Sequence, residues 1–156
     1  MKRGICPGSF DPVTWGHIDI FERASAMFNE LYVGVFSNVR KKPFLNVEKR
    51  IEALEKATEH IENIKVISFD GLLADYMRAN DISMIVRGLR SVTDFEYEQS
   101  NANAIRSVHS NLDTVFLLCR PEYSYISSSV VREIASFNGD ISKLVPPCVA
   151  EMINGR

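Results

Sequence analysis

The sequence predicts an α/β fold, with a five-stranded, mainly parallel sheet and helices on both faces. Short apolar runs alternate about five times with longer segments of helical periodicity, the pattern of repeated strand–helix units. The runs lack the in-and-out alternation of a sheet that faces water on one side, so both faces should be covered. No linker, repeat or low-complexity stretch is visible, and we expect one domain over residues 1–156.

Five short apolar runs are predicted as the strands. Each is rich in aliphatic or aromatic residues and is bounded by polar residues or glycine. They lie at residues 4–7, 31–36, 64–69, 84–86 and 114–118.

Helical periodicity predicts a helix after each strand. The first has an apolar face made by Ile18, Ile20, Phe21, Ala24, Met27 and Phe28. The next, over residues 46–59, has Val47, Ile51, Leu54, Ala57 and Thr58 on one side. Further helices are predicted at residues 72–79, 93–107 and 128–137, with a short last helix after Pro146-Pro147.

The helix ends carry recognisable signals. Asn46 is a good N-cap for the second helix. Residues 93–96 have the spacing of a capping box for the fourth. Gly139 is the expected C-terminal stop of the fifth.

The composition is that of an ordinary globular chain. Apolar residues make up 46% and charged residues 24%, and the formal net charge is −2, so disorder is not expected. A general nucleic-acid binder is not expected either, because the chain is slightly acidic and has no long basic run. Any anionic ligand must therefore be held by a local cluster of cations.

Cysteine usage indicates a reducing compartment. Cys6, Cys119 and Cys148 are odd in number and far apart, which argues against a disulfide scaffold and a zinc site. Cys6 and Cys119 lie in or beside apolar runs and should be buried. No segment resembles a signal peptide or a membrane helix, so we expect a cytoplasmic protein without a membrane partner.

The loop after the first strand is the first candidate site. Ligands of parallel sheets bind outside the carboxyl ends of the strands, where the strand order reverses. Residues 7–17 combine two glycines with Ser9, Thr14 and His17, the last in the first turn of the following helix. A helix N-terminus attracts phosphate, and a histidine there can donate a hydrogen bond to it. Simple capping of the helix by His17 is the alternative.

The loop after the second strand is basic. Residues 37–44 contain Arg40, Lys41 and Lys42, which suit an anion at the end of a strand. A solvated charge run is the alternative interpretation.

The segment after residue 86 is predicted as a loop that forms a phosphate clamp. Arg87 and Arg90 flank a glycine there, and the arginine fork fits phosphate oxygens. Glu98, on the helix behind, is a candidate acceptor for a ligand hydroxyl.

Serines dominate the last of these loops. Ser127, Ser128 and Ser129 open a helix, where N-capping needs only one hydroxyl, so the others are surplus and indicate a phosphate site. Arg132 lies near the same helix start, where a cation opposes the dipole, which suggests that a bound anion compensates it.

Several familiar sites are absent from the sequence. There is no Walker A motif, no GxGxxG, no HExxH and no evident nucleophilic triad. Phosphate-binding loops with one histidine favour phosphoryl or nucleotidyl transfer by positioning and charge stabilisation.

These segments together resemble a known family. Thr14-Trp15-Gly16-His17 resembles the (T/H)xGH motif of the nucleotidylyltransferase superfamily, and residues 126–132 resemble its ISSxxxR-like second signature. In order and spacing, similarity to the bacterial phosphopantetheine adenylyltransferase family extends to residues 7–12, 41–43, 87–90 and 94–98. The resemblance covers essentially the whole chain.

The resemblance implies a Rossmann-like, doubly wound fold and a specific reaction. AMP would pass from ATP to 4′-phosphopantetheine by direct in-line attack, with Mg²⁺ and without a covalent intermediate. The products would be dephospho-coenzyme A and pyrophosphate, in coenzyme A biosynthesis. A homohexamer and feedback by coenzyme A are also implied.

The resemblance assigns roles to matching residues. His17 and Lys41 would be catalytic, with His17 stabilising charge on the α-phosphate. The acceptor would be bound by Ser9, Lys41, Leu73 and Arg87. ATP would be bound by Ser9, Phe10, His17, Gly88, Leu89, Arg90, Glu98, Tyr123, Ser124, Tyr125, Ile126, Ser127, Ser128 and Ser129. The metal ligands are left unassigned.

Two positions depart from the commonest family pattern. Ser9 stands where threonine is usual and keeps the hydroxyl. Trp15 stands where asparagine is frequent, and its bulk should alter either the packing of the loop or a subunit contact.

Two other functions stay open at this point. One is a nucleotidylyltransferase with another phosphate acceptor, and the other is a non-catalytic nucleotide-binding domain. For transfer between two phosphorylated substrates, the cations should converge on one cleft, while most acidic residues should lie on outer helix faces. These cations are Lys41, Lys42, Arg87, Arg90 and Arg132.

Overall fold

A computed structural model describes residues 1–36 and 42–155 of the chain. In this part, the strands are Arg3–Gly8 (β1), Glu30–Phe36 (β2), Ile64–Phe69 (β3), Met84–Leu89 (β4) and Asp113–Leu118 (β5). They form one sheet of order β3-β2-β1-β4-β5 in which every neighbouring pair is parallel. The predicted five-stranded parallel sheet is confirmed.

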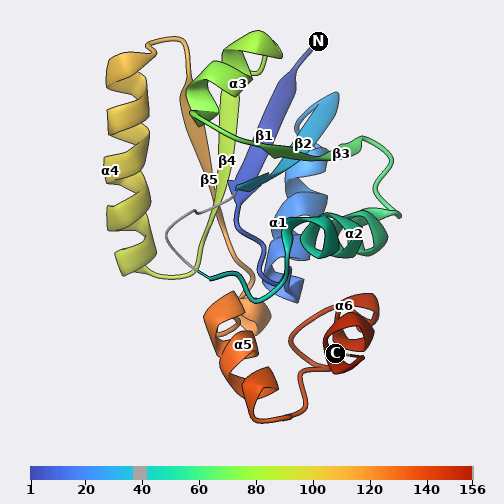
Figure 1. The fold of residues 1–156 in the computed structure, drawn as a ribbon. Coiled ribbons are helices and arrows are strands. Elements are labelled where there is room, and N and C mark those ends of the chain that lie inside the picture. The colour runs from blue at the N-terminus through green and yellow to red at the C-terminus, as the bar shows by residue number, and fades with distance from the viewer. Residues whose placement is uncertain (37–41, 156) are drawn as a thin grey trace.

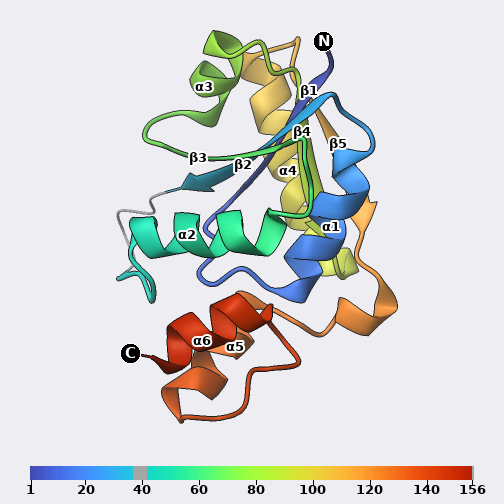
Figure 2. The same ribbon diagram turned by 90° about the vertical axis from the view of Figure 1, so that its right-hand side faces the viewer.

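Helices cover both faces of this sheet, as predicted. They are Trp15–Ser25 (α1), Val47–Thr58 (α2), Leu73–Ala79 (α3), Val92–Val108 (α4), Ser128–Ser136 (α5) and Pro147–Asn154 (α6), with a 3₁₀ turn over Pro121–Tyr123. In Figures 1 and 2, α5 and α6 lie together at the end of the sheet opposite the N-terminus. None of the helices described is long and apolar enough to cross a membrane.

Two apolar clusters sandwich the sheet, which explains the uninterrupted apolar runs. Ile5 of β1 packs with Met77 of α3 on one face. The next residue, Cys6, joins Phe21 of α1 and Val33 of β2 on the other face. All of these side chains are buried. Each strand therefore needs apolar side chains at consecutive positions.

The strand order reverses between β1 and β4, and the two strands separate there. They pair only at Gly4–Met84 and Ile5–Ile85, at their amino ends. Further along, Pro7 has no N–H to offer a ladder. The guanidinium of Arg87 (Nη1) donates instead to the carbonyl oxygen of Pro7, at 2.6 Å. The gap between β1 and β4 is the switch point at which such sheets bind ligands.

The predicted loop at residues 86–90 is wrong in its first part. β4 continues through Arg87 and Gly88 to Leu89, because these residues keep their register with β5 up to Leu118. The arginine and the glycine are thus fixed by the sheet rather than by a turn.

Two predicted helix ends are also wrong. The cap of α4 is Ser91, whose hydroxyl accepts from the N–H of Asp94 at 3.1 Å, rather than Thr93. After α5, Asn138 rather than Gly139 takes the left-handed conformation, with φ of 55°. Gly139 is required for space, since a Cβ there would lie 2.6 Å from a side-chain carbon of Ile134.

Candidate active site

An open cleft of about 540 Å³ lies at the carboxyl ends of β1 and β4. Its walls are the loop after β1, the first turn of α1, the end of β4 and the first turn of α5. Many of the residues predicted to bind ATP line it. These are Ser9, His17, Gly88, Arg90, Ile126, Ser127, Ser128 and Ser129.

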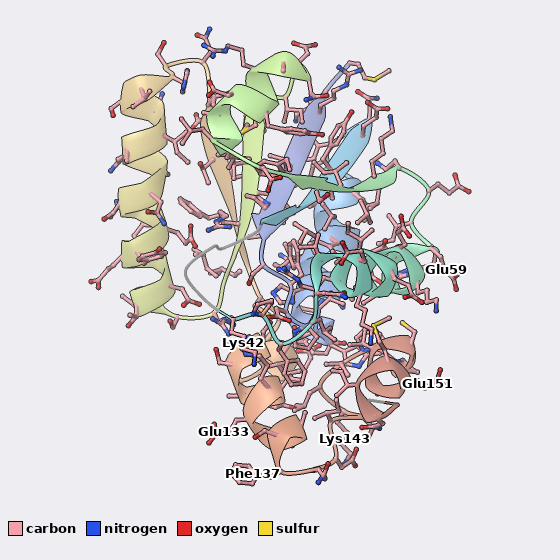
Figure 3. The ribbon with its side chains drawn as sticks, viewed as in Figure 1. Lys42, Glu59, Glu133, Phe137, Lys143 and Glu151 are labelled. Carbon is pink, nitrogen blue, oxygen red and sulfur yellow. The ribbon has the colours of Figure 1, made fainter. Side chains whose placement is uncertain are left out.

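Four described cations line this cleft. They are Lys42, Arg50, Arg90 and Arg132. In Figure 3, Lys42 lies where the lower end of the sheet meets α5, whereas Phe137 lies at the far end of that helix. Lys42, Arg90 and Arg132 thus converge on the cleft as predicted, whereas Arg87 lines two smaller cavities instead. Lys41 lies outside the described residues.

Arg50 was missed by the sequence reasoning. Its side chain is buried, on the same face of α2 as Leu54 and Ala57. The helical spacing of residues 50, 54 and 57 could have found it, because an arginine on an apolar face needs a buried partner. That partner is the carbonyl oxygen of Ser9, which accepts from Nη1 at 2.9 Å.

His17 is held in one orientation. The main-chain N–H of Thr14 donates to its Nδ1 at 3.0 Å. Its ring meets Phe10 edge-on, with 5.1 Å between centroids, and lies nearly parallel to Phe21. Burial, together with the nearby charge of Arg90, lowers the pKa of His17 to about 4. The imidazole is thus neutral near pH 7 and, with Nδ1 accepting, carries its proton on Nε2.

The loop between β1 and α1 is tied down from two sides. Arg132 of α5 donates to the carbonyl oxygen of Asp11 at 2.7 Å, and the hydroxyl of Ser128 donates to that of Pro12 at 2.8 Å. From α2 comes the bond of Arg50 to Ser9 described above. Helices far apart in sequence therefore fix the loop that carries Ser9 and leads into His17.

Asp11 connects this loop to the segment before α2. Its side chain is buried, and its two oxygens accept from the main-chain N–H groups of Phe44 and Leu45 at 2.8 and 2.7 Å. No role for this aspartate was expected from the sequence. A carboxylate in a Pro-flanked loop gives little sign of such a long-range contact.

The three serines at the start of α5 are not surplus, and that part of the prediction is wrong. Ser127 caps the helix through the N–H of Val130, and Ser128 binds Pro12 as above. The hydroxyl of Ser129 accepts from Arg132 at 3.2 Å. The guanidinium of Arg132 thus has hydrogen-bond acceptors within the protein, the carbonyl of Asp11 and the hydroxyl of Ser129. The capacity of this turn to bind an anion therefore rests on its main-chain N–H groups.

Two smaller cavities continue from the cleft through the gap between β1 and β4. One, of about 240 Å³, shares Ser9, His17 and Gly88 with the cleft. The other, of about 310 Å³, lies toward α3 and α4 and is lined by Leu73. Arg87 and Glu98 line both of these smaller cavities.

Some predicted ATP residues do not line these three cavities. Leu89 is buried in the core, Ser124 donates its hydroxyl to the carbonyl of Pro121, and Tyr125 is exposed. Tyr123 packs on the core, with its carbonyl oxygen beside Gly16. Phe10 does line the smallest cavity, and its side chain packs in the core.

The three cysteines are free, and of the two that were predicted to be buried only Cys6 is buried. Cys6 is buried, which raises the pKa of its thiol to about 12. Cys119 is only partly buried and lines the cleft, so its predicted burial is wrong.

Trp15 packs on the core of its own chain, and its main-chain N–H donates to the carbonyl oxygen of Leu144.

The described residues contain no group of three or more His, Cys, Asp or Glu side chains that would hold a metal ion. The donor set of the cleft is instead cationic and hydroxylic, which suits phosphate groups.

Comparisons with known proteins agree with this geometry. Residues 5–134 match the cytidylyltransferase-like family. The chain has the fold of a protein from Vibrio parahaemolyticus described as a nicotinate-nucleotide adenylyltransferase, with a TM-score of 0.70, 17% identity and 99% of each chain covered.

Curated relatives are much closer in sequence. The phosphopantetheine adenylyltransferase of Shouchella clausii is 51% identical, over 98% of this chain and 96% of the relative. The phosphopantetheine adenylyltransferase of Thermobifida fusca is 50% identical, over 100% of this chain and 94% of the relative. With the (T/H)xGH histidine, Arg90 and the serine-rich helix start around one cleft, the chain belongs to the phosphopantetheine adenylyltransferase family.

Proposed function

We propose that the chain transfers AMP from ATP to 4′-phosphopantetheine, forming dephospho-coenzyme A and pyrophosphate. The observation that carries this proposal is the junction of the cleft with the cavity beside Arg87, where Ser9, His17 and Gly88 line both spaces. A reaction between two phosphorylated substrates needs such a junction, with a charge-stabilising group beside it.

The cleft is suited to the triphosphate. Arg90, Arg132 and Lys42 supply positive charge, and the first turn of α5 offers main-chain N–H groups that have no partner within the helix. Gly16 lines this end, and a Cβ there would lie 3.7 Å from Sγ of Cys119, which also lines the cleft.

The smaller cavities are suited to the acceptor. Arg87 stands between them, where its guanidinium can bind the phosphate of phosphopantetheine. Leu73 and the neighbouring apolar side chains of α4 then face the pantetheine arm. The resemblance implied the same two residues for the acceptor, with Leu73 contacting the pantetheine arm through its main chain.

The chemical step needs no covalent enzyme intermediate. An oxygen of the acceptor phosphate attacks the α-phosphorus, the bond to the bridging oxygen breaks, and pyrophosphate leaves with the electron pair. His17 donates its Nε2–H to the charge that develops on the α-phosphate. Because its pKa is low, it acts as a neutral hydrogen-bond donor rather than as an acid. Lys41, outside the described residues, is assigned by resemblance to the same phosphate.

Mg²⁺ is the proposed cofactor. It would arrive on the triphosphate, since Mg²⁺ keeps most of its waters and often binds through substrate phosphates rather than a protein cage. Bound there, it would neutralise phosphate charge.

Pyrophosphate release tests the proposal against its alternatives. ATP should release pyrophosphate with 4′-phosphopantetheine as acceptor, but not with nicotinate mononucleotide or glycerol 3-phosphate. Turnover with a control acceptor alone would assign the chain to another nucleotidylyltransferase. Failure with all three would favour the non-catalytic nucleotide-binding domain.

A homohexamer is the proposed assembly. On α4 no residue is buried, and apolar side chains of α4 and β5 face solvent, among them Phe95, Tyr97 and Leu118. A subunit contact would cover them. Light scattering during size-exclusion chromatography gives the mass of the assembly directly.

Feedback by coenzyme A is a further expectation, and it would be measured as inhibition that is competitive with phosphopantetheine. A cytoplasmic location is also expected.

A further inference from the structure

Asp19 of α1 is a buried acidic residue that does not itself line the large cleft. Nη1 of Arg23 donates to its Oδ2 at 3.2 Å, and the main-chain N–H of Arg120 donates to the same oxygen at 3.3 Å. Nε of Arg120 forms an ion pair with Oδ1 at 3.0 Å. A buried carboxylate needs such partners, and two of these three nitrogens belong to a residue shortly after β5.

The face of α1 that carries Asp19 contacts the end of β5 at two further points. Nη1 of Arg23, four residues further on, donates to the carbonyl oxygen of Leu118 at 2.7 Å. At Gly16, three residues earlier, a Cβ would lie 3.7 Å from Sγ of Cys119. Residues three and four apart share one face of a helix, so a single face of α1 holds the start of the segment after β5.

A chain of hydrogen bonds runs from Arg120 to the cleft. The N–H of Tyr123 donates to the carbonyl oxygen of Arg120, and the N–H of Ile126 donates to that of Tyr123, each at 3.0 Å. Nη1 of Arg90 then donates to the carbonyl oxygen of Ile126 at 3.1 Å. The next residue, Ser127, is the N-cap of α5. The placement of Arg120 is thus linked to a cation and to a helix start of the cleft.

Residues 118–127 serve the large cleft and neither of the two smaller cavities. Cys119, Ile126 and Ser127 line the large cleft, and no residue of this segment lines the other two spaces. The large cleft is the space that suits the triphosphate, and the smaller cavities suit the acceptor. A shift of this segment should therefore disturb the nucleotide and leave the acceptor side in place.

We propose that Asp19 is a positioning residue for ATP: from behind the cleft, it holds the segment that places Arg90 and the start of α5. Asp19 has this role only if the large cleft is the nucleotide site, so the inference rests on the proposed function. An apolar side chain of similar size would fill the same space, but it would offer no acceptor to the main chain of Arg120.

Asp19→Asn keeps the size of the side chain and removes its charge. The amide retains one acceptor oxygen, so its NH₂ group must face N–H groups of Arg23 or Arg120. We expect the Kd for a non-hydrolysable ATP analogue to rise about three- to thirtyfold, the range for residues that act on a ligand through others. The Kd for phosphopantetheine should change by less than about twofold. In steady-state kinetics, the KM for ATP should rise more than kcat falls.

Glu30→Gln is the matched control. The carboxylate of Glu30 also pairs with two cations, with Arg3 at 2.8 Å and with Lys65, but it lies at the opposite, amino end of the sheet. It lines none of the three cavities. Both Kd values should therefore stay within about twofold of those of the unsubstituted chain. Equal weakening of ATP-analogue binding in Glu30→Gln and Asp19→Asn would overturn the inference, because lost stability would then explain both.

Arg120→Gln examines the same path from a half-exposed side chain, so its result does not depend on whether Asp19→Asn folds. It removes the ion pair but keeps the main-chain contact, and it should weaken ATP-analogue binding about threefold. With Asp19→Asn in place, Arg120→Gln should have little further effect. Unchanged ATP-analogue binding in Arg120→Gln, or full additivity of the two substitutions, would contradict the proposed path.

Calorimetric titration of each ligand separately gives these Kd values. Phosphopantetheine binding that weakens as much as ATP-analogue binding in Asp19→Asn would also overturn the role of Asp19. The proposed function can fail by itself, if the unsubstituted chain binds the ATP analogue but transfers no AMP to phosphopantetheine. In that case, the Kd values for the ATP analogue still decide whether Asp19 positions the nucleotide.

Discussion

The main-chain nitrogen of Thr14 and Nδ1 of His17 lie 3.0 Å apart, and this hydrogen bond determines which ring nitrogen of the histidine carries the proton. An N–H can donate only to an unprotonated ring nitrogen, so Nδ1 accepts and Nε2 keeps the proton. The contact closes the first turn of α1, which means that the fold itself selects the tautomer. His17, which lines the cleft, therefore carries a hydrogen-bond donor at Nε2 without any change of protonation.

The first prediction concerns the charge of His17. Burial and Arg90 lower its pKa to about 4, so it should stay neutral from pH 5 to pH 8. Long-range ¹H–¹⁵N spectra should show one Nε2–H tautomer with constant shifts in this range. Titration near the ordinary value of about 6.5 would contradict the burial that the structure shows.

The same lowered pKa gives stability a pH dependence of known sign. Between pH 4 and about 6.5 the unfolded chain binds a proton at residue 17 that the folded chain does not, so this contribution to stability is lost as pH falls through that window. Comparing chemical denaturation of the chain and of His17→Gln at pH 7 and 5 measures it. In His17→Gln, the free energy of unfolding should differ less between pH 7 and pH 5 than it does in the unsubstituted chain.

The second prediction is catalytic. His17→Ala should lower turnover by roughly 10²–10³, the effect of losing one transition-state donor. Binding of an ATP analogue should change little, because the donor acts on charge that appears during transfer. Single-turnover rates and equilibrium binding separate the two effects. Near-normal turnover would remove His17 from this role.

The third prediction contrasts two glycines. A Cβ at Gly88 would lie 2.8 Å from the side chain of Ile20, between β4 and α1, so Gly88→Ala should destabilise the fold by about 1–3 kcal/mol. A Cβ at Gly16 meets nothing nearer than 3.6 Å. Gly16→Ala should therefore keep its unfolding midpoint but weaken nucleotide binding. Equal midpoints for both variants would show that α1 can shift to relieve the contact at Gly88.

The sequence predicts the sheet and the strand-end site well because both follow from local patterns. Apolar runs report burial on both faces, and polar residues at strand ends lie together in any parallel sheet. The positions of His17, Arg90 and the serines follow from these two rules. The family resemblance adds Leu73, which no local pattern indicates.

Long-range hydrogen bonds are the part that could not be predicted. Arg50 and Asp11 each form a hydrogen bond with a partner far away in the sequence, and no periodicity encodes that partner. The acidic residues were expected on outer faces, yet Asp19 is buried and pairs with Arg120 at 3.0 Å. Buried polar groups become visible only once the tertiary fold brings their partners together.

The last prediction tests the clamp made by Asp11. Asp11→Asn offers one acceptor to two N–H groups, those of Phe44 and Leu45, and leaves one of them unsatisfied in a buried place. We expect a loss of about 1–3 kcal/mol in the free energy of unfolding. Turnover should fall as well, because Lys42, on the clamped segment, lines the cleft.

Asp140→Asn is a matched control for this experiment. Asp140 also accepts from a main-chain N–H, that of Ser142 at 2.9 Å, but it is exposed and does not line the cleft. It should change stability by no more than about 0.5 kcal/mol, since water can replace the lost bond, and turnover should stay normal. Urea unfolding and steady-state kinetics on the same preparations give both quantities. An Asp11→Asn chain as stable and as active as the control would mean that the segment before α2 is held by its apolar contacts alone.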